Sequence, residues 1–310
     1  MSNHRSKLNR PQPGDEDYKE PPNVKLQPRD LRIINLVYKH RLLSSEQIYA
    51  LINGSRTKLK RRLQKLWLNE YLERPPDQKV LRVRGDLRHL IYSLGQKGAE
   101  ILAAEKGYDI AQLNWVQRSE VKFPFIQHNL YVSEFFTVLK LALQEEEAVE
   151  LTDWRQGKEI EARIRRPPNF EARDSRSSKP LLQPDGLFAL NYLPEGNKQY
   201  FYLEADRGTI RERTMLGRFR KYWAFWQQRV FKGQGIPADQ GFRVLTVCKN
   251  STRARNLKNL VRDEDPWRSK RKMTTMFWFT HQQWSIEKPE PILGNCWKTA
   301  KIDRKRSLLD

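Results

Sequence analysis

Cysteine is scarce in this sequence, and its scarcity excludes several classes of protein. Cys248 and Cys296 are the only two cysteines, too few for a disulfide framework. No CxxC motif or Cys/His cluster indicates a zinc site. We therefore expect two ordinary thiols in a reducing compartment.

Long apolar segments are also missing. No apolar run approaches the roughly 20 residues that cross a bilayer, and the N-terminus has no apolar signal-peptide core. There is no lipidation signal, and no helix has a Trp/Leu face opposite a Lys face. The sequence therefore predicts a cytoplasmic protein with no membrane partner.

Acidic residues are too few to balance the basic ones. Lys and Arg number 58 against 37 Asp and Glu, which gives a net charge of +21. Such a surplus attracts polyanions, and nucleic acid is the commonest polyanion in a cell. Hydrophobic residues make up 38% of the chain, enough to build cores, so wholesale disorder is excluded.

The order of segments predicts an α+β protein of two domains. Residues 1–27 are polar and contain four prolines, and we expect a disordered arm. A first domain occupies residues 28–107, a linker 108–122 and a second domain 123–285. Residues 286–310 form a basic tail, expected to be solvated, with an extra phosphate contact as the alternative.

Three helices are predicted in the first domain, followed by a hairpin. Ser44 and Gln47 form a capping box for the second helix, and Ser55 caps the third. Strands at Lys79–Arg84 and Leu87–Leu94 then flank a Gly-Asp turn. This order is that of a winged helix-turn-helix, whose wing arginines would contact DNA backbone or minor groove: Arg82, Arg84 and Arg88.

The third helix carries the prediction of DNA binding. No acidic residue occurs between Ser55 and Asn69, whereas a merely solvated helix normally mixes charges. An all-cationic face containing Gln suits a helix in a major groove. The predicted DNA contacts on this helix are Thr57, Lys58, Arg61, Arg62, Gln64 and Lys65. The alternatives are a helical bundle with a solvated basic face and a protein-interaction module.

The second domain is predicted to be an α/β sandwich around a mixed sheet. A helix at His128–Leu143 precedes several strands, and a long helix follows at Arg211–Phe231. The expected strands are Val149–Trp154, Glu159–Ile164, Leu187–Leu190, Gln199–Ala205 and Phe242–Cys248, with Met276–Thr280 as an edge strand. A further helix is expected at Arg253–Arg262.

Three carboxylates in this domain form a candidate site. Glu204 and Asp206 share one face of a strand because side chains alternate, and Asp185 opens the neighbouring strand. Such a cluster resembles a site for Mg²⁺, which takes carboxylate and phosphate oxygens. The alternative is that Pro184-Asp185-Gly186 is only a turn. Arg211, Arg218 and Lys221 on the long helix are candidates to neutralise the cluster, and Lys221 is preferred.

The two halves together resemble the replication-relaxation family of bacterial plasmids and other mobile elements. The resemblance covers roughly residues 28–262. It rests on short motifs in a fixed order, which are Arg29-Asp30, Leu42–Ile48, Lys60–Leu66, Tyr92–Gly98, His128-Asn129-Leu130, Pro184-Asp185-Gly186, Glu204–Thr209 and Lys221-Tyr222.

The second half also resembles the PD-(D/E)xK nuclease fold, of restriction-endonuclease-like type. Pro184-Asp185 and Glu204 fit that pattern, but Asp206 stands where the lysine belongs. In some members the lysine lies on the following helix, and Lys221 matches that position. The resemblance implies Asp185, Glu204 and Lys221 as catalytic residues, with Mg²⁺ held by Asp185 and Glu204. The carboxylate cluster itself adds Asp206 as a third candidate metal ligand.

Three functions remain open at this point. The first is a DNA-binding accessory protein for replication, relaxation or mobilisation of a mobile element. It would act on double-stranded DNA with a relaxase, replication or recombination protein, as a monomer or a homodimer. The second is a Mg²⁺-dependent DNA endonuclease. The third is a transcription regulator whose second domain only dimerises.

Overall fold

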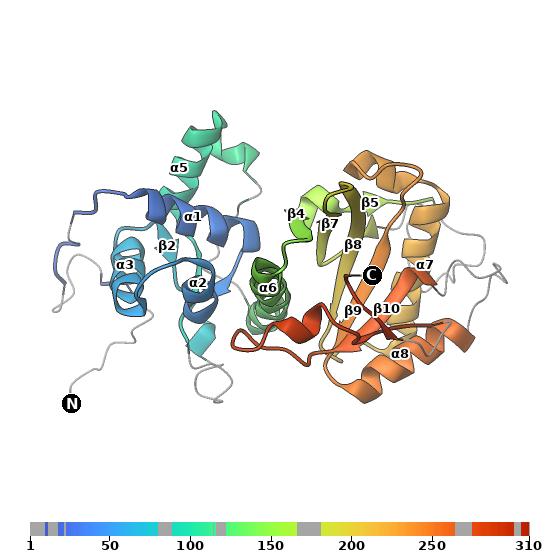
Figure 1. The fold of residues 1–310 in the computed structure, drawn as a ribbon. Coiled ribbons are helices and arrows are strands. Elements are labelled where there is room, and N and C mark those ends of the chain that lie inside the picture. The colour runs from blue at the N-terminus through green and yellow to red at the C-terminus, as the bar shows by residue number, and fades with distance from the viewer. Residues whose placement is uncertain are drawn as a thin grey trace. The chain divides into compact units, whose positions relative to one another are not determined.

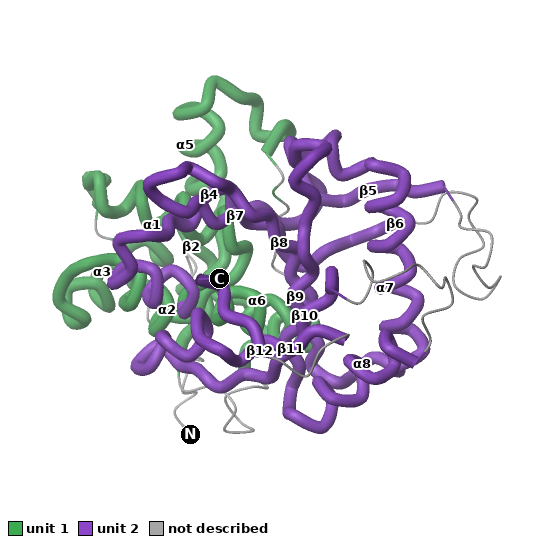
Figure 2. The backbone as a smooth tube through the Cα atoms, turned by 45° about the vertical axis from the view of Figure 1, so that its right-hand side comes forward, with its two compact units in different colours: residues 1–137 green, residues 138–310 purple. Residues whose placement is uncertain are grey.

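The computed structural model describes most of the chain. The described residues are 10–11, 18–21, 23–79, 89–113, 115, 122–165, 181–263, 275–300 and 305–309. The chain divides into two compact units, residues 1–137 and 138–310, coloured green and purple in Figure 2. The fold is mixed α and β, as predicted.

The first unit is built from helices around a small sheet. Its elements are α1 (Pro28–His40), β1 (Leu43–Ser44), α2 (Ser45–Leu51), α3 (Arg56–Leu68), β2 (Leu72–Glu73), β3 (Ile91–Leu94), α5 (Gln96–Lys106), the 3₁₀ helix η1 (Ile110–Gln112) and α6 (Phe123–Ala142), whose last residues enter the second unit. The three strands pair antiparallel in the order β1-β3-β2.

The capping box predicted for α2 is present, whereas Ser55 lies at the N-cap position of α3 with no side-chain cap hydrogen bond to the described residues. Ser44 Oγ accepts from the Gln47 N–H at 3.2 Å, and Gln47 Oε1 accepts from the Ser44 N–H at 2.8 Å. These reciprocal bonds satisfy two backbone donors at the start of α2. Gly107 follows α5 with a φ of 65°, the left-handed conformation common after a helix.

Little of the predicted hairpin lies within the described residues. Lys79 lies in a short helical turn. Among the described residues, the end of β3 pairs with β2, at Leu72–Glu73. The Gly85-Asp86 turn and the three wing arginines lie outside the described residues.

Parts of the segments predicted to be an arm and a linker pack onto this unit. Val24 is 9% exposed and joins the apolar core. Arg10 Nε donates to the Trp67 carbonyl at 2.8 Å, at the end of α3. Leu113 is buried, and Trp115 Nε1 donates to the Leu94 carbonyl at 3.2 Å. The expectation of disorder fails at Arg10 and Val24 because their side chains find partners in the fold.

The second unit is a seven-stranded sheet with two helices on one face (Figure 1). The sheet order is β12-β11-β10-β9-β8-β7-β4. Its strands are β4 (Val149–Arg155), β7 (Gly186–Tyr192), β8 (Asn197–Asp206), β9 (Arg243–Cys248), β10 (Phe277–His281), β11 (Trp297–Thr299) and β12 (Lys305–Arg306). The strands β8, β9 and β10 run parallel, and the remaining neighbours are antiparallel.

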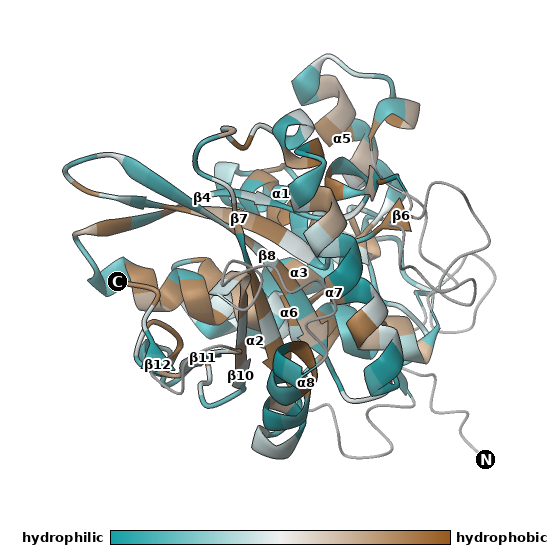
Figure 3. Ribbon diagram, turned by 90° about the vertical axis from the view of Figure 1, so that its right-hand side faces the viewer, coloured by the Kyte–Doolittle hydropathy of each residue, from teal (hydrophilic) through white to brown (hydrophobic). Residues whose placement is uncertain are grey.

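The helices α7 (Glu212–Gln227) and α8 (Ser251–Asp263) are the crossovers between these parallel strands. Successive right-handed crossovers cover the same face of a sheet. Phe219 and Tyr222 of α7 and Leu257 of α8 are fully buried against Tyr202 and Phe277 of the sheet. The amphipathic character of α8 is visible in Figure 3, where hydrophilic and hydrophobic segments both occur along the helix.

The opposite face of the sheet carries a row of aromatic rings. Phe188 stacks on Phe201 with ring centroids 5.2 Å apart, and Trp154 and Trp278 flank this pair. Gly186 begins β7 beside this row, where an added Cβ would lie 3.2 Å from the Trp154 ring. The glycine of the Pro184-Asp185-Gly186 motif is therefore explained by a close approach within the sheet.

The minor elements of the unit are short. They are η2 (Leu143–Glu145), η3 (Gly157–Ile160), the two-stranded pair β5 (Ala162–Arg163) and β6 (Leu181–Leu182), η4 (Val230–Gln234) and η5 (Glu290–Ile292). The strand predicted at Glu159–Ile164 is thus split into a 3₁₀ turn and β5.

The predicted solvated tail is instead part of the sheet. β11 and β12 extend it beyond β10, so β10 is an inner strand and not an edge strand. Trp297 is fully buried, and its Nε1 donates to the Ile292 carbonyl at 2.9 Å. The expectation failed because charge dominates the composition of this segment and hides its buried residues.

Among the helices that the structure describes, none has the length and apolar character needed to cross a lipid bilayer.

Candidate functional site

The helix α3 presents a polar, cationic face to solvent. Leu59, Leu63 and Leu66 are fully buried in the core of the first unit, as the helical period predicts. The residues on the other side are exposed, and they are Thr57, Lys58, Arg61, Gln64 and Lys65. Among the described residues, no carboxylate forms an ion pair with Lys58, Arg61 or Lys65. Their charges are therefore available to an anionic ligand.

Arg62 does not belong to this exposed face. Its Nε donates to Asp30 Oδ1 at 2.6 Å, and its Nη2 donates both to Asp30 Oδ2 and to the Lys25 carbonyl. The Asp30 side chain is fully buried, and its hydrogen bond raises the pKa of Arg62. The guanidinium thus joins α3 to α1 and to the segment before it, whereas the sequence placed it among the DNA contacts.

Glu204 is the centre of the cluster in the second unit. It lies in β8 and is 1% exposed. Arg218 Nη1 donates to its Oε2 at 2.7 Å, and Tyr222 Oη donates to its Oε1 at 2.7 Å. Burial raises the pKa of Glu204 to about 7, although Arg218 acts in the opposite direction. Both carboxylate oxygens are therefore occupied by donors from α7.

Asp185 lies beside this carboxylate. Its Oδ2 accepts from the Ala205 N–H at 2.7 Å, and its own N–H donates to the Leu203 carbonyl at 3.0 Å. Its charge contributes to the raised pKa of Glu204 and of Arg218. The structure thus brings Asp185 and Glu204 together, as the sequence predicts.

Asp206 has a different partner. Arg253 of α8 donates from Nε to Asp206 Oδ2 at 2.7 Å, and the Gly208 N–H donates to Oδ1 at 3.1 Å. Arg253 Nη2 also donates to the Ile210 carbonyl at 2.6 Å. Alternation along β8 does place Asp206 on the same face as Glu204, but a separate ion pair holds it. The three predicted metal ligands therefore do not act on one centre.

The cation on Glu204 is Arg218, whereas the sequence favours Lys221. Lys221 Nζ donates to the Leu181 carbonyl of β6 at 3.2 Å. Arg218 and Tyr222 are four residues apart, so they share one side of α7. Since Tyr222 is fully buried against the sheet, Arg218 also faces the sheet. This spacing is the signal in the sequence that could have identified Arg218.

A family model described as Replication-relaxation matches residues 34–238, about two thirds of the chain. The chain belongs to the replication-relaxation family. The match includes α3 and the cluster around Glu204, and it ends before β9. No curated protein and no solved structure shows a significant match.

A nuclease-like member of this family would need Mg²⁺ at the carboxylate cluster around Glu204. Mg²⁺ binds one or two carboxylates together with water and phosphate oxygens. Both oxygens of Glu204 are held by donors, and Arg218 supplies the positive charge at that point. Within the described part of the chain, no group of three His, Cys, Asp or Glu side chains is arranged to hold a metal ion. The residues as arranged do not fit a divalent cation.

Proposed function

We propose that this member of the replication-relaxation family is a DNA-binding accessory protein in replication, relaxation or mobilisation of a plasmid or other mobile element. The observation that carries the proposal is the exposed face of α3, which has three cations and no acid. In this proposal Arg61 and Gln64 read base edges, while Lys58 and Lys65 contact phosphates.

The element order of the first unit supports this role for α3. Helices α1, α2 and α3 are followed by β2 and β3, and β3 pairs with β1 as well as β2. This is the order of a winged helix-turn-helix, in which the third helix enters the major groove. In our proposal the second unit is a nuclease-like scaffold that has no catalytic role and that holds DNA or a partner such as a relaxase.

The test is duplex binding as a function of salt. Neutralised phosphates release counterions, so the affinity of a protein falls with salt in proportion to its phosphate contacts. Replacing both Arg61 and Lys65 by Ala should weaken duplex binding and lower the salt slope by about one, for the lost phosphate contact of Lys65, over roughly 50–200 mM salt. The matched control is Arg32→Ala with Lys39→Ala, which removes the same two residue types from exposed positions on α1. Equal binding and equal slopes in the two variants would contradict the assignment of α3.

The second candidate function is a Mg²⁺-dependent DNA endonuclease. The proximity of Asp185 and Glu204 favours it, and the Arg218–Glu204 ion pair opposes it. Incubation of the protein with supercoiled plasmid in Mg²⁺, Mn²⁺ or EDTA decides between the two candidates. We expect binding without nicking. Metal-dependent nicking that is lost in Glu204→Ala would make the protein an enzyme and would contradict a scaffold role.

A further inference from the structure

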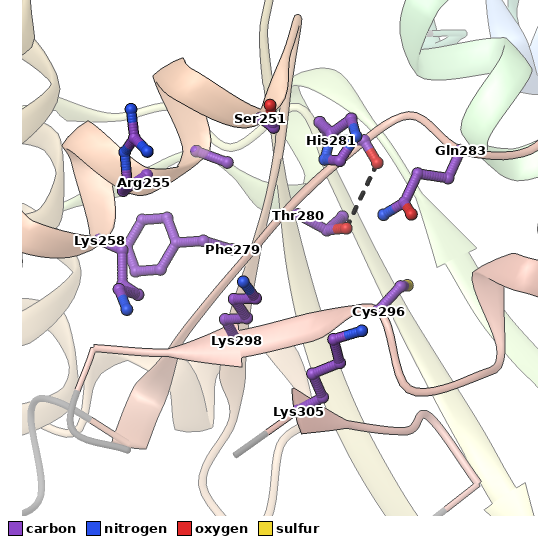
Figure 4. A pocket seen from close by; sticks show the side chains of 11 residues that line it. Ser251, Arg255, Lys258, Phe279, Thr280, His281, Gln283, Cys296, Lys298 and Lys305 are labelled. Atoms are coloured by element: carbon purple, nitrogen blue, oxygen red, sulfur yellow. Dashed lines mark hydrogen bonds between the residues drawn. The ribbon is translucent and has the colours of Figure 1, made fainter. Parts of the chain in front are cut away.

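A cavity in the second unit lies outside the part of the chain that the family model matches. Its volume is about 390 Å³, and it lies between α8 and the strands β10 to β12 (Figure 4). Every residue that lines it falls between Ser251 and Lys305, beyond the matched residues 34–238.

The lining of this cavity is strongly cationic. Arg255 and Lys258 come from α8, Lys298 from β11 and Lys305 from β12, and no lining residue is Asp or Glu. Figure 4 shows these four side chains around the cavity, and α8 ends more than thirty residues before β11 begins. Among the described residues, no carboxylate forms an ion pair with Arg255, Lys298 or Lys305. Arg255, Lys298 and Lys305 thus bring positive charge to one cavity whose described lining contains no carboxylate, and this arrangement favours a bound anion.

The cavity also contains hydrogen-bonding groups that suit an anion with several oxygens. Ser251, Thr280, His281 and Gln283 line it together with the cations. Thr280 is 3% exposed, and its Oγ1 already donates its one proton to the His281 carbonyl at 3.3 Å, so the other three residues are the candidates to contact the anion. Burial, and then the charge of Lys298, lowers the pKa of His281, which indicates that this lysine lies close to the imidazole.

The cavity lies at the carboxyl end of β10. The strands β9 and β10 run parallel and end at Cys248 and His281, and His281 lines the cavity. Ser251 follows β9 and begins α8, but Asn250 Oδ1 already accepts the Arg253 N–H at 2.9 Å. The side chains, more than the end of the helix, must therefore hold the ligand.

We propose that this cavity binds a phosphate group, either from a nucleic-acid strand or from a free mononucleotide. Lys298 and Arg255 contact the phosphate oxygens from opposite walls, and Lys258 and Lys305 supply further charge. None of the residues that line the cavity belongs to α3, so this proposal does not depend on the proposed role of α3.

The experiment compares phosphate ligands on the full-length chain with the double variant Arg255→Ala and Lys298→Ala. Both side chains are exposed, so their removal should leave the fold intact, as a thermal melt will verify. The background carries Arg61→Ala and Lys65→Ala, which separates this site from α3. The matched control is Lys198→Ala with Arg262→Ala, which removes one Lys and one Arg from exposed positions in the same unit.

The probes are inorganic phosphate, adenosine monophosphate and a 12-nucleotide single strand, titrated at constant ionic strength. We expect Kd to rise by about tenfold or more in the cavity variant and to stay near the background value in the control. Binding of the strand alone identifies a nucleic-acid backbone as the source, and binding of the free phosphates as well identifies a mononucleotide site. Equal affinities in the cavity and control variants, or no binding of any probe to the background protein, would overturn the proposal.

Discussion

Arg218 Nη1 lies 2.7 Å from Glu204 Oε2, so a guanidinium of α7 neutralises a buried carboxylate of β8. The other oxygen of this carboxylate accepts from Tyr222. Removing one partner of a buried ion pair leaves the other uncompensated, which is strongly destabilising. The pair is therefore important for the stability of this part of the sheet.

The first prediction concerns the response to Mg²⁺. We expect the Tm of the wild-type chain to be the same in MgCl₂ and in NaCl of equal ionic strength, because the carboxylate of Glu204 is already paired with Arg218. Arg218→Met frees two neighbouring carboxylates, so Mg²⁺ should raise the Tm of this variant by about 2–4 °C. The rise should disappear when Glu204→Gln is added. A Mg²⁺-induced rise in the Tm of the wild-type chain that is lost in Asp185→Asn would show that Asp185 and Glu204 bind a metal ion.

The second prediction concerns pH. The pKa of Glu204 is raised by burial to about 7, above the value of 4.5 for an unperturbed glutamate. The folded chain then binds more protons than the unfolded chain between these two values, so its free energy of unfolding falls as pH rises from about 5 to 8. Replacing Glu204 by Gln should remove this slope, which is worth about 3 kcal/mol at most. Urea denaturation at several pH values measures it. Parallel pH profiles for the two proteins would rule out titration of Glu204 in this range.

The third prediction separates Arg62 from its neighbour Arg61. Arg62→Ala leaves the fully buried Asp30 without its cation, and we expect a loss of about 3 kcal/mol in the free energy of unfolding. Arg61→Ala removes an exposed side chain and should change stability by about 0.5 kcal/mol or less, while it weakens DNA binding. Urea titrations and duplex binding measure the two properties. Equal stability losses in the two variants would show that the Arg62–Asp30 pair contributes little.

The fourth prediction concerns the end of the chain. Trp297 is fully buried in β11, so Trp297→Ala should lower the free energy of unfolding by about 3–5 kcal/mol. The matched control in the same strand is Lys298→Ala, whose side chain is exposed. Thermal or urea denaturation compares them. A Trp297→Ala variant as stable as the control would mean that β11 and β12 are dispensable additions to the sheet.

The sequence by itself determined what depends on local periodicity. The period of α3 places its leucines on one side and its cations on the other, because neighbours on a helix face are three or four residues apart. The capping box at Ser44 and Gln47 is equally local, and the alternation of β8 puts Glu204 and Asp206 on one face.

Only the tertiary structure decided which charges meet. Arg218 and Arg253 both follow β8 in sequence, yet the first pairs with Glu204 and the second with Asp206. The path of the two crossover helices sets that choice, and no spacing within one element encodes it. The same holds for Arg62, which the sequence groups with Arg61 as a DNA contact but which pairs with a buried carboxylate of another helix. The cationic cavity likewise exists only because α8, β11 and β12 converge.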